Sequence, residues 1–145
     1  MKLVIQRVSS ASVRADGRET GRIALGFLVL VGAENGDTPA DAEEAARKVA
    51  GLRVFEDAEG KMNLSLADVG GSVLVVSQFT LAADLSRGRR PGLERALPGR
   101  EAEPLYERFV AALETQGLPV STGVFGAAMQ VSLVNEGPAT FLLDV

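Results

Sequence analysis

The sequence predicts a single α+β domain over residues 1–145, built on a mostly antiparallel, barrel-like β-sheet with two principal helices. Two observations lead to this fold class. Apolar runs suited to strands cluster around hairpin signals such as Asp16-Gly17, whereas only two segments show helical spacing. The length is that of one domain, and it is sufficient to bury a core without a disulfide or a structural metal.

The expected strands are short segments rich in Val, Ile, Leu and Phe. They are Lys2–Ala15, Glu19–Ile23, Gly26–Val31, Leu52–Phe55, Met62–Leu66, Ser72–Leu81, Val120–Phe125, Met129–Val134 and Ala139–Val145. Turns are expected at Asp57–Lys61, at Asp68–Gly71 and at Asn135–Pro138, because Gly, Pro, Asp and Asn punctuate the chain there. Ala82–Gly99 has no period and predicts a long loop.

Both expected helices carry a narrow apolar face. The first begins after Thr38, a good N-cap, with Pro39 at the first helical position. Its apolar residues recur at i, i+3, i+4 and i+7, and they are Ala42, Ala45, Ala46 and Val49. The second is expected to start at Pro104 and to stop at Gly117. The small residues of the first helix predict close packing on the sheet.

The chain contains neither cysteine nor histidine. Disulfides, thiolate nucleophiles and Ser-His-Asp or Cys-His catalysis are therefore excluded. Any catalysis has to use carboxylates, hydroxyls, lysines, backbone donors or groups on the substrate. No cofactor and no metal site are predicted, because Glu43-Glu44 is typical of a solvated helix face and no glycine-rich loop has phosphate-binding spacing.

The N-terminal sequence MKLVIQRVSS predicts a first strand and not a signal peptide. No apolar run approaches the ~20 residues that a membrane-spanning helix requires. We therefore expect a cytoplasmic protein without a membrane partner. The net charge of −4 also argues against general affinity for DNA.

The charge is nevertheless uneven along the chain. Ser86–Arg100 holds five arginines and a single glutamate, Glu94. A flexible arginine-rich loop on an acidic domain is a candidate phosphate contact, with Arg87, Arg89 and Arg90 at its centre. The alternative is a solvated loop whose arginines pair with carboxylates of the same domain, and the sequence leaves both readings open.

The stretch Ser72–Leu81 combines an apolar run with polar residues at its end. Val73-Leu74-Val75-Val76 suits a central strand covered on both faces, and Ser77, Gln78 and Thr80 then surround Phe79. Gln78 and nearby N–H groups are candidates for an oxyanion hole. Ser77 and Thr80 are candidate nucleophiles, but no histidine is present to activate them. The alternative is that these groups only satisfy the hydrogen bonds of neighbouring strands.

Gly137-Pro138 lies between two apolar strands. Proline cannot donate to a β-ladder and belongs at an edge or a break. An X-Pro bond is also the common location of a cis peptide, although a turn with a trans bond is the ordinary case. A rigid main chain at this position is a candidate device for excluding a substrate substituent by steric clash.

Together with these two features, several segments resemble the D-aminoacyl-tRNA deacylase family, also called the D-tyrosyl-tRNA deacylases. They span the chain from end to end and keep the family's order: MKLVIQRVSSASV (1–13), FEDAEGKMNLSL (55–66), SQFTL (77–81), GRRP (88–91), EPLYERF (103–109), TGVFGAAMQVSLVN (122–135) and NEGPATF (135–141).

The resemblance implies an enzyme that hydrolyses the ester between a D-amino acid and the 3′-terminal adenosine of tRNA. It also implies removal of glycine mischarged on alanine tRNA. The family works as a homodimer with its site at the interface and needs no cofactor. Its catalysis is RNA-assisted, because the 2′-OH of the substrate helps to activate water.

The resemblance also assigns roles to residues. Gly137-Pro138 would be a cis element that one subunit lends to its partner's pocket, where it rejects L-amino acids. The residues implied at the reacting ester are Ser77, Gln78, Phe79 and Thr80, and those implied near the adenosine are Phe125 and Met129. Thr80 matches a residue once proposed as nucleophile. On a regular strand, however, Ser77 and Thr80 lie on opposite faces, which favours Gln78 with backbone donors.

Two alternatives come from other functional classes. One is a non-catalytic module that binds the tRNA end or a nucleotide on the same fold. The other is a structural dimer in which Arg87–Arg100 only tethers loops. The intact SQFT and GP motifs favour the enzyme, because a binding module would not need them.

Overall fold

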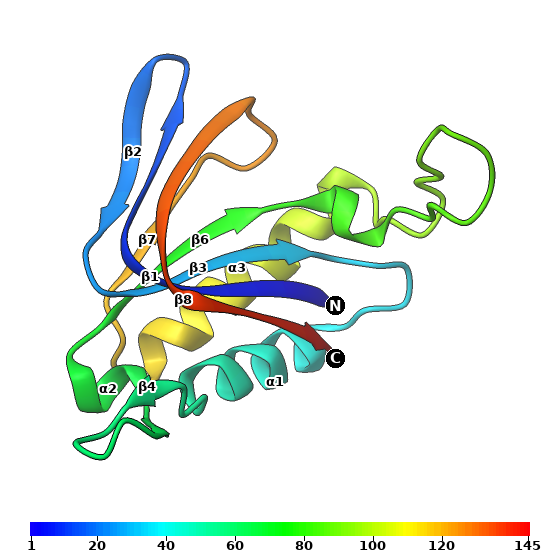
Figure 1. The fold of residues 1–145 in the computed structure, drawn as a ribbon. Helices are drawn as coiled ribbons and strands as arrows, with labels where there is room; N and C mark the ends of the chain where they lie inside the picture. The colour runs from blue at the N-terminus through cyan, green and yellow to red at the C-terminus, as the bar shows by residue number, and fades with distance from the viewer.

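A strand of 14 residues, β1 (Lys2–Ala15), is the spine of the sheet. One edge of β1 pairs antiparallel with β8 (Met129–Asp144), and the other pairs antiparallel with β2 (Arg18–Ile23) and then with β3 (Gly26–Gly32). This computed structural model describes residues 1–145. Because β2 and β3 follow one another along the same edge, β1 has neighbours on both sides along nearly its whole length (Figure 1).

The sheet continues from β3 with two parallel pairings. β3 pairs with β6 (Ser72–Ser77), and β6 pairs with β7 (Val120–Thr122). Three of the five pairings are antiparallel, and the Ser121 hydroxyl of β7 donates to the Arg22 carbonyl of β2 at 3.3 Å. The sheet is therefore nearly barrel-shaped, and the predicted α+β class is confirmed. The parallel pairs were not predicted; each follows a helical crossover.

Two helices, α1 (Pro39–Ala50) and α3 (Gly99–Thr115), cover the same face of the sheet (Figure 1). The predicted cap of α1 is confirmed, because the Thr38 hydroxyl accepts from the Asp41 N–H. In return the Asp41 carboxylate accepts from the Thr38 hydroxyl and N–H, which lowers the pKa of Asp41. The main core lies between the helices and the sheet and includes Phe27, Val75, Ala45, Val49 and Phe109.

The boundaries of the helices differ from the prediction in two places. α3 begins at Gly99 and not at Pro104, which lies inside the helix. The first residues of α3 are mostly charged and carry no apolar period, so the sequence pattern did not reveal them. A short helix, α2 (Leu66–Val69), replaces the end of an expected strand and the start of an expected turn, and Ser65 and Asp68 form a capping box for it.

The strands also differ from the prediction. β4 (Phe55–Glu56) and β5 (Met62–Leu64) form a separate two-stranded sheet, so Leu52–Val54 is not a strand. β6 ends at Ser77 and β7 at Thr122, earlier than expected. β8 does not stop at Asn135–Pro138 but passes through it, with two shifts of register against β1. The expected turn is therefore absent, and a bulge carries the chain from one stretch of pairing with β1 to the next.

Candidate active site

The central strand β6 leaves the sheet at Ser77. The next N–H, that of Gln78, still donates to the Val31 carbonyl of β3 at 2.7 Å. The chain then turns into η1, a 3₁₀ helix over Phe79–Ala82. The first N–H groups of a helix have no acceptor within it, so the N–H groups of Phe79 and Thr80 have no intrahelical partner. The prediction of a regular strand to Leu81 was wrong at this break.

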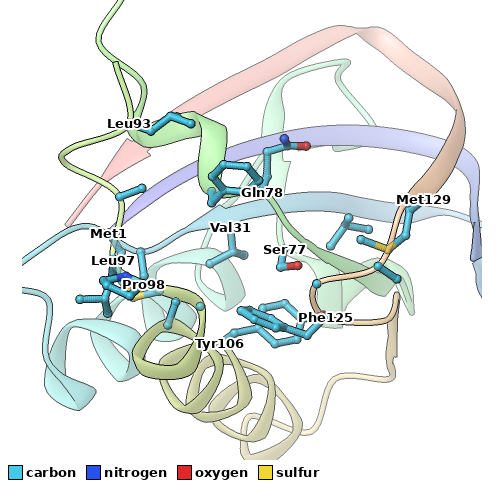
Figure 2. Close-up of a pocket in the computed structure, with 18 of the residues that line it drawn as sticks. Met1, Val31, Ser77, Gln78, Leu93, Leu97, Pro98, Tyr106, Phe125 and Met129 are labelled. Carbon is cyan, nitrogen blue, oxygen red and sulfur yellow. The ribbon is translucent and has the colours of Figure 1, made fainter. Parts of the chain in front are cut away.

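A cavity of about 580 Å³ lies at the end of β6. It is bounded by η1, by the start of α3 and by the segment that leads from β7 into β8 (Figure 2). Five of the residues that the sequence singled out line it together, namely Ser77, Gln78, Phe79, Phe125 and Met129. They come from two stretches of chain, 77–79 and 125–129, that are separated by more than forty positions, and the fold brings both to one pocket.

The lining is apolar with a few polar side chains. Fourteen of its 19 residues are hydrophobic, and the polar side-chain groups belong to Ser77, Gln78 and Tyr106. No carboxylate, lysine or arginine lines the cavity. The chain therefore offers hydrogen-bond donors and a shaped apolar surface at this site, but no ionisable side chain that would act as a general base near neutral pH.

Thr80 does not line the cavity. Its side chain is exposed, and its hydroxyl accepts a hydrogen bond from Nε2 of Gln78 at 2.5 Å. Thr80 thus holds the amide of Gln78, whereas the Ser77 side chain lies in the pocket (Figure 2). As expected, the side chains of Ser77 and Thr80 do not both reach the pocket. They are separated by the turn of the chain into η1, and not by the alternation of side chains along a strand.

Tyr106 of α3 forms the floor of the cavity and was missed in the sequence. Its hydroxyl donates to the Val75 carbonyl at 3.0 Å, and its ring lies 5.6 Å from that of Phe125, measured between centroids (Figure 2). Burial raises the pKa of Tyr106 to about 12. It is the one tyrosine of the chain and lies within the EPLYERF segment, but nothing in the sequence places that segment beside Phe125.

A second missed part of the site is the wall contributed by residues 93–99. Leu93, Leu97 and Pro98 line the cavity on the side away from Met129 (Figure 2). The length of the expected loop Ala82–Gly99 was the signal, because long loops in compact domains often carry function. Met1 also lines the cavity, and no pattern in the sequence pointed to it.

The Gly137–Pro138 bond is cis, and both residues are exposed on β8. Neither lines the cavity of its own chain. The segment is nevertheless held firmly. The Asn135 amide donates to the Ala139 carbonyl and accepts from the Ala139 N–H, at 2.9 and 3.0 Å, and the buried Arg7 donates through Nε to the Glu136 carbonyl at 2.8 Å.

The arginine-rich loop divides into two groups. Backbone hydrogen bonds of 2.8 and 2.9 Å between Asp84 and Gly92 close its outer part. Within it Arg87, Arg89 and Arg90 are exposed and form no ion pair in the chain. Arg95 and Arg100 do pair with carboxylates, Glu34 at 2.9 Å and Glu101 at 3.6 Å. The alternative of internal pairing is thus correct for these two alone.

The structure shows no cluster of three or more carboxylates arranged to hold a metal ion. None of its helices is long and apolar enough to cross a membrane.

Comparison with known proteins places the chain in a family. The sequence model described as D-Tyr-tRNA(Tyr) deacylase matches residues 4–144. Proteins named D-aminoacyl-tRNA deacylase are similar over nearly the whole chain. That of Geotalea uraniireducens is 56% identical over 99% of this chain and 93% of its own length, and that of Thermomicrobium roseum is 57% identical over 99% and 94%.

Two solved structures are similar in fold. A c-Myc DNA Unwinding Element Binding Protein matches with a TM-score of 0.93 and 40% identity, over 100% of this chain and 99% of that one. A probable eukaryotic D-amino acid tRNA deacylase matches with a TM-score of 0.85 over 99% and 98%, but at 17% identity, and so supports the fold alone.

A nearly barrel-shaped α+β domain whose apolar pocket holds a side-chain amide, but no carboxylate, lysine or arginine, is suited to an enzyme that acts by positioning its substrate. The chain belongs to the D-Tyr-tRNA(Tyr) deacylase family. The expected family and the expected enzyme class, a deacylase, are confirmed.

Proposed function

We propose that the protein hydrolyses the ester that joins a D-amino acid to the 3′-terminal adenosine of tRNA, and that it also removes glycine mischarged on alanine tRNA. The cytoplasm is its proposed place of action, because charged tRNA is used there. The observation that carries the proposal is the break after β6, which brings the Gln78 amide and the Phe79 N–H to the rim of an apolar pocket. The names of the relatives support the same reaction.

In the proposed reaction a water oxygen adds to the ester carbonyl, and negative charge develops on the carbonyl oxygen. The Phe79 N–H and the Gln78 amide stabilise this charge, and the Ser77 hydroxyl orients the ester. The bond to the ribose 3′-oxygen then breaks, and that oxygen takes up a proton. Because no side chain that would act as a general base near neutral pH lines the pocket, the 2′-OH of the substrate assists the activation of water. Thr80 positions Gln78 and does not attack.

The terminal adenosine is proposed to bind against Phe125 and Met129, beside the ring of Tyr106. These side chains give one part of the cavity an aromatic and thioether surface. A purine base stacks favourably on such a surface without needing a charged partner.

Rejection of L-amino acids is proposed to come from the partner subunit of a homodimer, through Gly137–Pro138. Two observations support this arrangement. The element is rigid and exposed but does not reach its own pocket. In addition β8 pairs on one edge alone and carries the exposed apolar side chains Leu133, Val134 and Leu142, so a free edge is available to a second copy.

Arg87, Arg89 and Arg90 are proposed to contact phosphates of the tRNA. They are exposed, lack internal ion pairs and sit on a loop closed at its base by Asp84 and Gly92. Neutralising one such contact should lower the slope of log affinity against log salt by about 1.

The decisive experiment is hydrolysis of matched D-Tyr-tRNA and L-Tyr-tRNA by purified protein in EDTA. Rapid release of D-tyrosine with the L-ester spared is the expected result. Binding of both without hydrolysis, even after metal is restored, would instead favour a module that binds the tRNA end. Equal cleavage of the two esters would keep the hydrolase and remove the role of Gly137–Pro138. A duplex DNA competitor tests the DNA binding named for one structural relative.

Two variants assign the roles of residues. Gln78→Ala should lower kcat for D-Tyr-tRNA by about 100-fold, the effect of losing one oxyanion donor. Gln116→Ala, an exposed amide outside the pocket, is the matched control. A Cβ added at Gly137 would lie 2.1 Å from the Ala139 nitrogen, so Gly137→Ala must displace the element. It should raise hydrolysis of the L-ester, and an unchanged D-over-L ratio would count against the gate.

A further inference from the structure

The pocket has a wall that the active-site motifs do not supply. Leu93, Ala96, Leu97 and Pro98 line the cavity opposite Met129. They follow directly on the arginine-rich outer loop and precede α3. Because this wall is irregular chain, it has no ladder or helix of its own to hold it in place.

Contacts from the segment after β3 hold the wall instead. The Asn35 N–H donates to the Arg95 carbonyl at 2.9 Å, and its side-chain amide donates to the Glu94 carbonyl at 2.7 Å. The Leu97 N–H donates to the Ala33 carbonyl at 3.0 Å. Each of these bonds ends on the main chain of the wall, so they attach residues 94–97 to the segment after β3 through the backbone.

One side chain reinforces this attachment. The Glu34 carboxylate is 13% exposed, and its Oε1 lies 2.9 Å from Nη2 of Arg95 as an ion pair without hydrogen-bond alignment. Its other oxygen lies 3.6 Å from Nζ of Lys2. The Glu34 N–H donates to Oδ2 of Asp37 at 2.6 Å, so the backbone that carries the carboxylate is also fixed. Arg95 is 63% exposed, so solvent screens the pair, and loss of the cation should have a modest effect.

We propose that Glu34 is a positioning residue for the substrate pocket, and that it acts by holding Arg95 and with it the wall formed by residues 93–98. Arg95 then belongs to the architecture of the pocket and is not one of the RNA contacts. This inference rests on the proposed function, because it concerns the site of the deacylation. It divides the arginines of one loop into a group that contacts phosphates and one residue, Arg95, that supports the pocket wall through Glu34.

The test compares Glu34→Gln and Arg95→Met in the full-length protein. Both should raise KM for D-Tyr-tRNA about two- to fivefold with kcat unchanged, the range expected for an ion pair open to solvent on one side. Glu44→Gln is the control, since Glu44 pairs with Arg47 on the outer face of α1, outside the pocket, and should leave KM unchanged. The thermal unfolding midpoint of each variant shows whether the fold is kept.

The salt dependence of KM separates the proposal from a contact with RNA. Arg95→Met should leave the slope of log KM against log salt as in the wild type, whereas Arg90→Met should flatten it by about 1. The charge-exchanged double variant Glu34→Arg with Arg95→Glu should recover part of the lost affinity. A flattened slope for Arg95→Met, or an unchanged KM in both single variants, would overturn the proposal.

Binding of 3′-deoxy-3′-(D-phenylalanylamino)adenosine, a non-hydrolysable amide analogue long enough to reach from the adenosine site toward the wall, followed by tyrosine fluorescence, makes the test independent of hydrolysis. Weaker binding in Glu34→Gln and Arg95→Met, but not in Glu44→Gln, would support the positioning role even if the wild type hydrolysed no D-Tyr-tRNA. In that case the proposed function would fail while the assignment of Glu34 to the pocket wall remained. Equal binding by all four proteins would overturn the assignment.

Discussion

Tyr106 offers a direct test of the pocket floor, because it is the single tyrosine in a chain without tryptophan. The perturbation is Tyr106→Phe, which removes the hydroxyl that donates to the Val75 carbonyl. That carbonyl also accepts from the Gly123 N–H at 3.1 Å, so it does not become unsatisfied. The variant should therefore lose only about 1 kcal/mol of unfolding free energy near neutral pH.

The pH dependence should be larger than this loss. Burial raises the pKa of Tyr106 from 10.0 to about 12, so the folded state holds the phenolic proton more tightly than the unfolded state does. This stability is fully present below pH 10.0 and is lost as the pH rises toward about 12. At about 1.4 kcal/mol for each pKa unit the loss amounts to about 3 kcal/mol. Tyr106→Phe has no such loss, so the two stability curves should cross within this interval.

The assay has two parts. The near-ultraviolet absorbance of tyrosinate reports the titration of Tyr106 alone, since the chain has no other tyrosine. Urea unfolding of the wild type and Tyr106→Phe at matched alkaline pH gives the difference in free energy, in which lysine and arginine titrations cancel. A tyrosinate midpoint near 10, or parallel stability curves, would refute the reasoning and show that the floor of the pocket is open to water.

Three further substitutions test the fold around the site. Phe109→Ala empties a fully buried position and should cost about 3 to 5 kcal/mol in urea unfolding; a loss under 1 would contradict the described core. Arg7→Met leaves the carbonyls of Val54 and Glu136 without their guanidinium donor, and should cost about 3 kcal/mol and speed hydrogen exchange around Gly137; unchanged exchange would argue against this support. Thr38→Ala removes the cap of α1 and should lower the thermal midpoint by the equivalent of about 1 kcal/mol, with no change in deacylation.

Much of the fold was predictable because its signals are local. Thr38 and Pro39 indicate the start of α1, and the four small apolar residues that follow define its buried face. The 14 residues of β1 were predicted with their observed ends. The start of α3 was not predicted, because Gly99–Glu103 are mostly charged and show no helical spacing of apolar residues.

The order of strands was beyond a local reading. The parallel pairing of β3 with β6 joins residues more than forty positions apart, and it depends on where the helices between them pack. The turn into η1 after Gln78 is a similar case. Phe79–Leu81 is a good strand sequence, yet it leaves the ladder just after the Gln78 carbonyl packs against Gly32, where a Cβ would lie 2.7 Å from that oxygen.

Some residues of the candidate site were likewise predictable from local sequence, and others were not. Ser77 and Gln78 were identified because polar residues after a buried strand need an explanation. Tyr106 and the Glu34–Arg95 pair were not, because each gains its place through contacts distant in sequence. A tyrosine in an amphipathic helix and a glutamate after a strand give no sequence signal of function, because their partners Val75 and Arg95 are known only from the fold.

The turn after β6 has a consequence for how such a protein tolerates mutation. In the proposed reaction Phe79 stabilises charge through its peptide N–H, a group that every amino acid except proline supplies. Missense changes there can alter the shape of the rim but rarely delete its donors. Under the proposed mechanism, substitutions can therefore change the side chains around the ester while the Phe79 N–H is retained, and the Gln78 amide is the one donor that a substitution can remove.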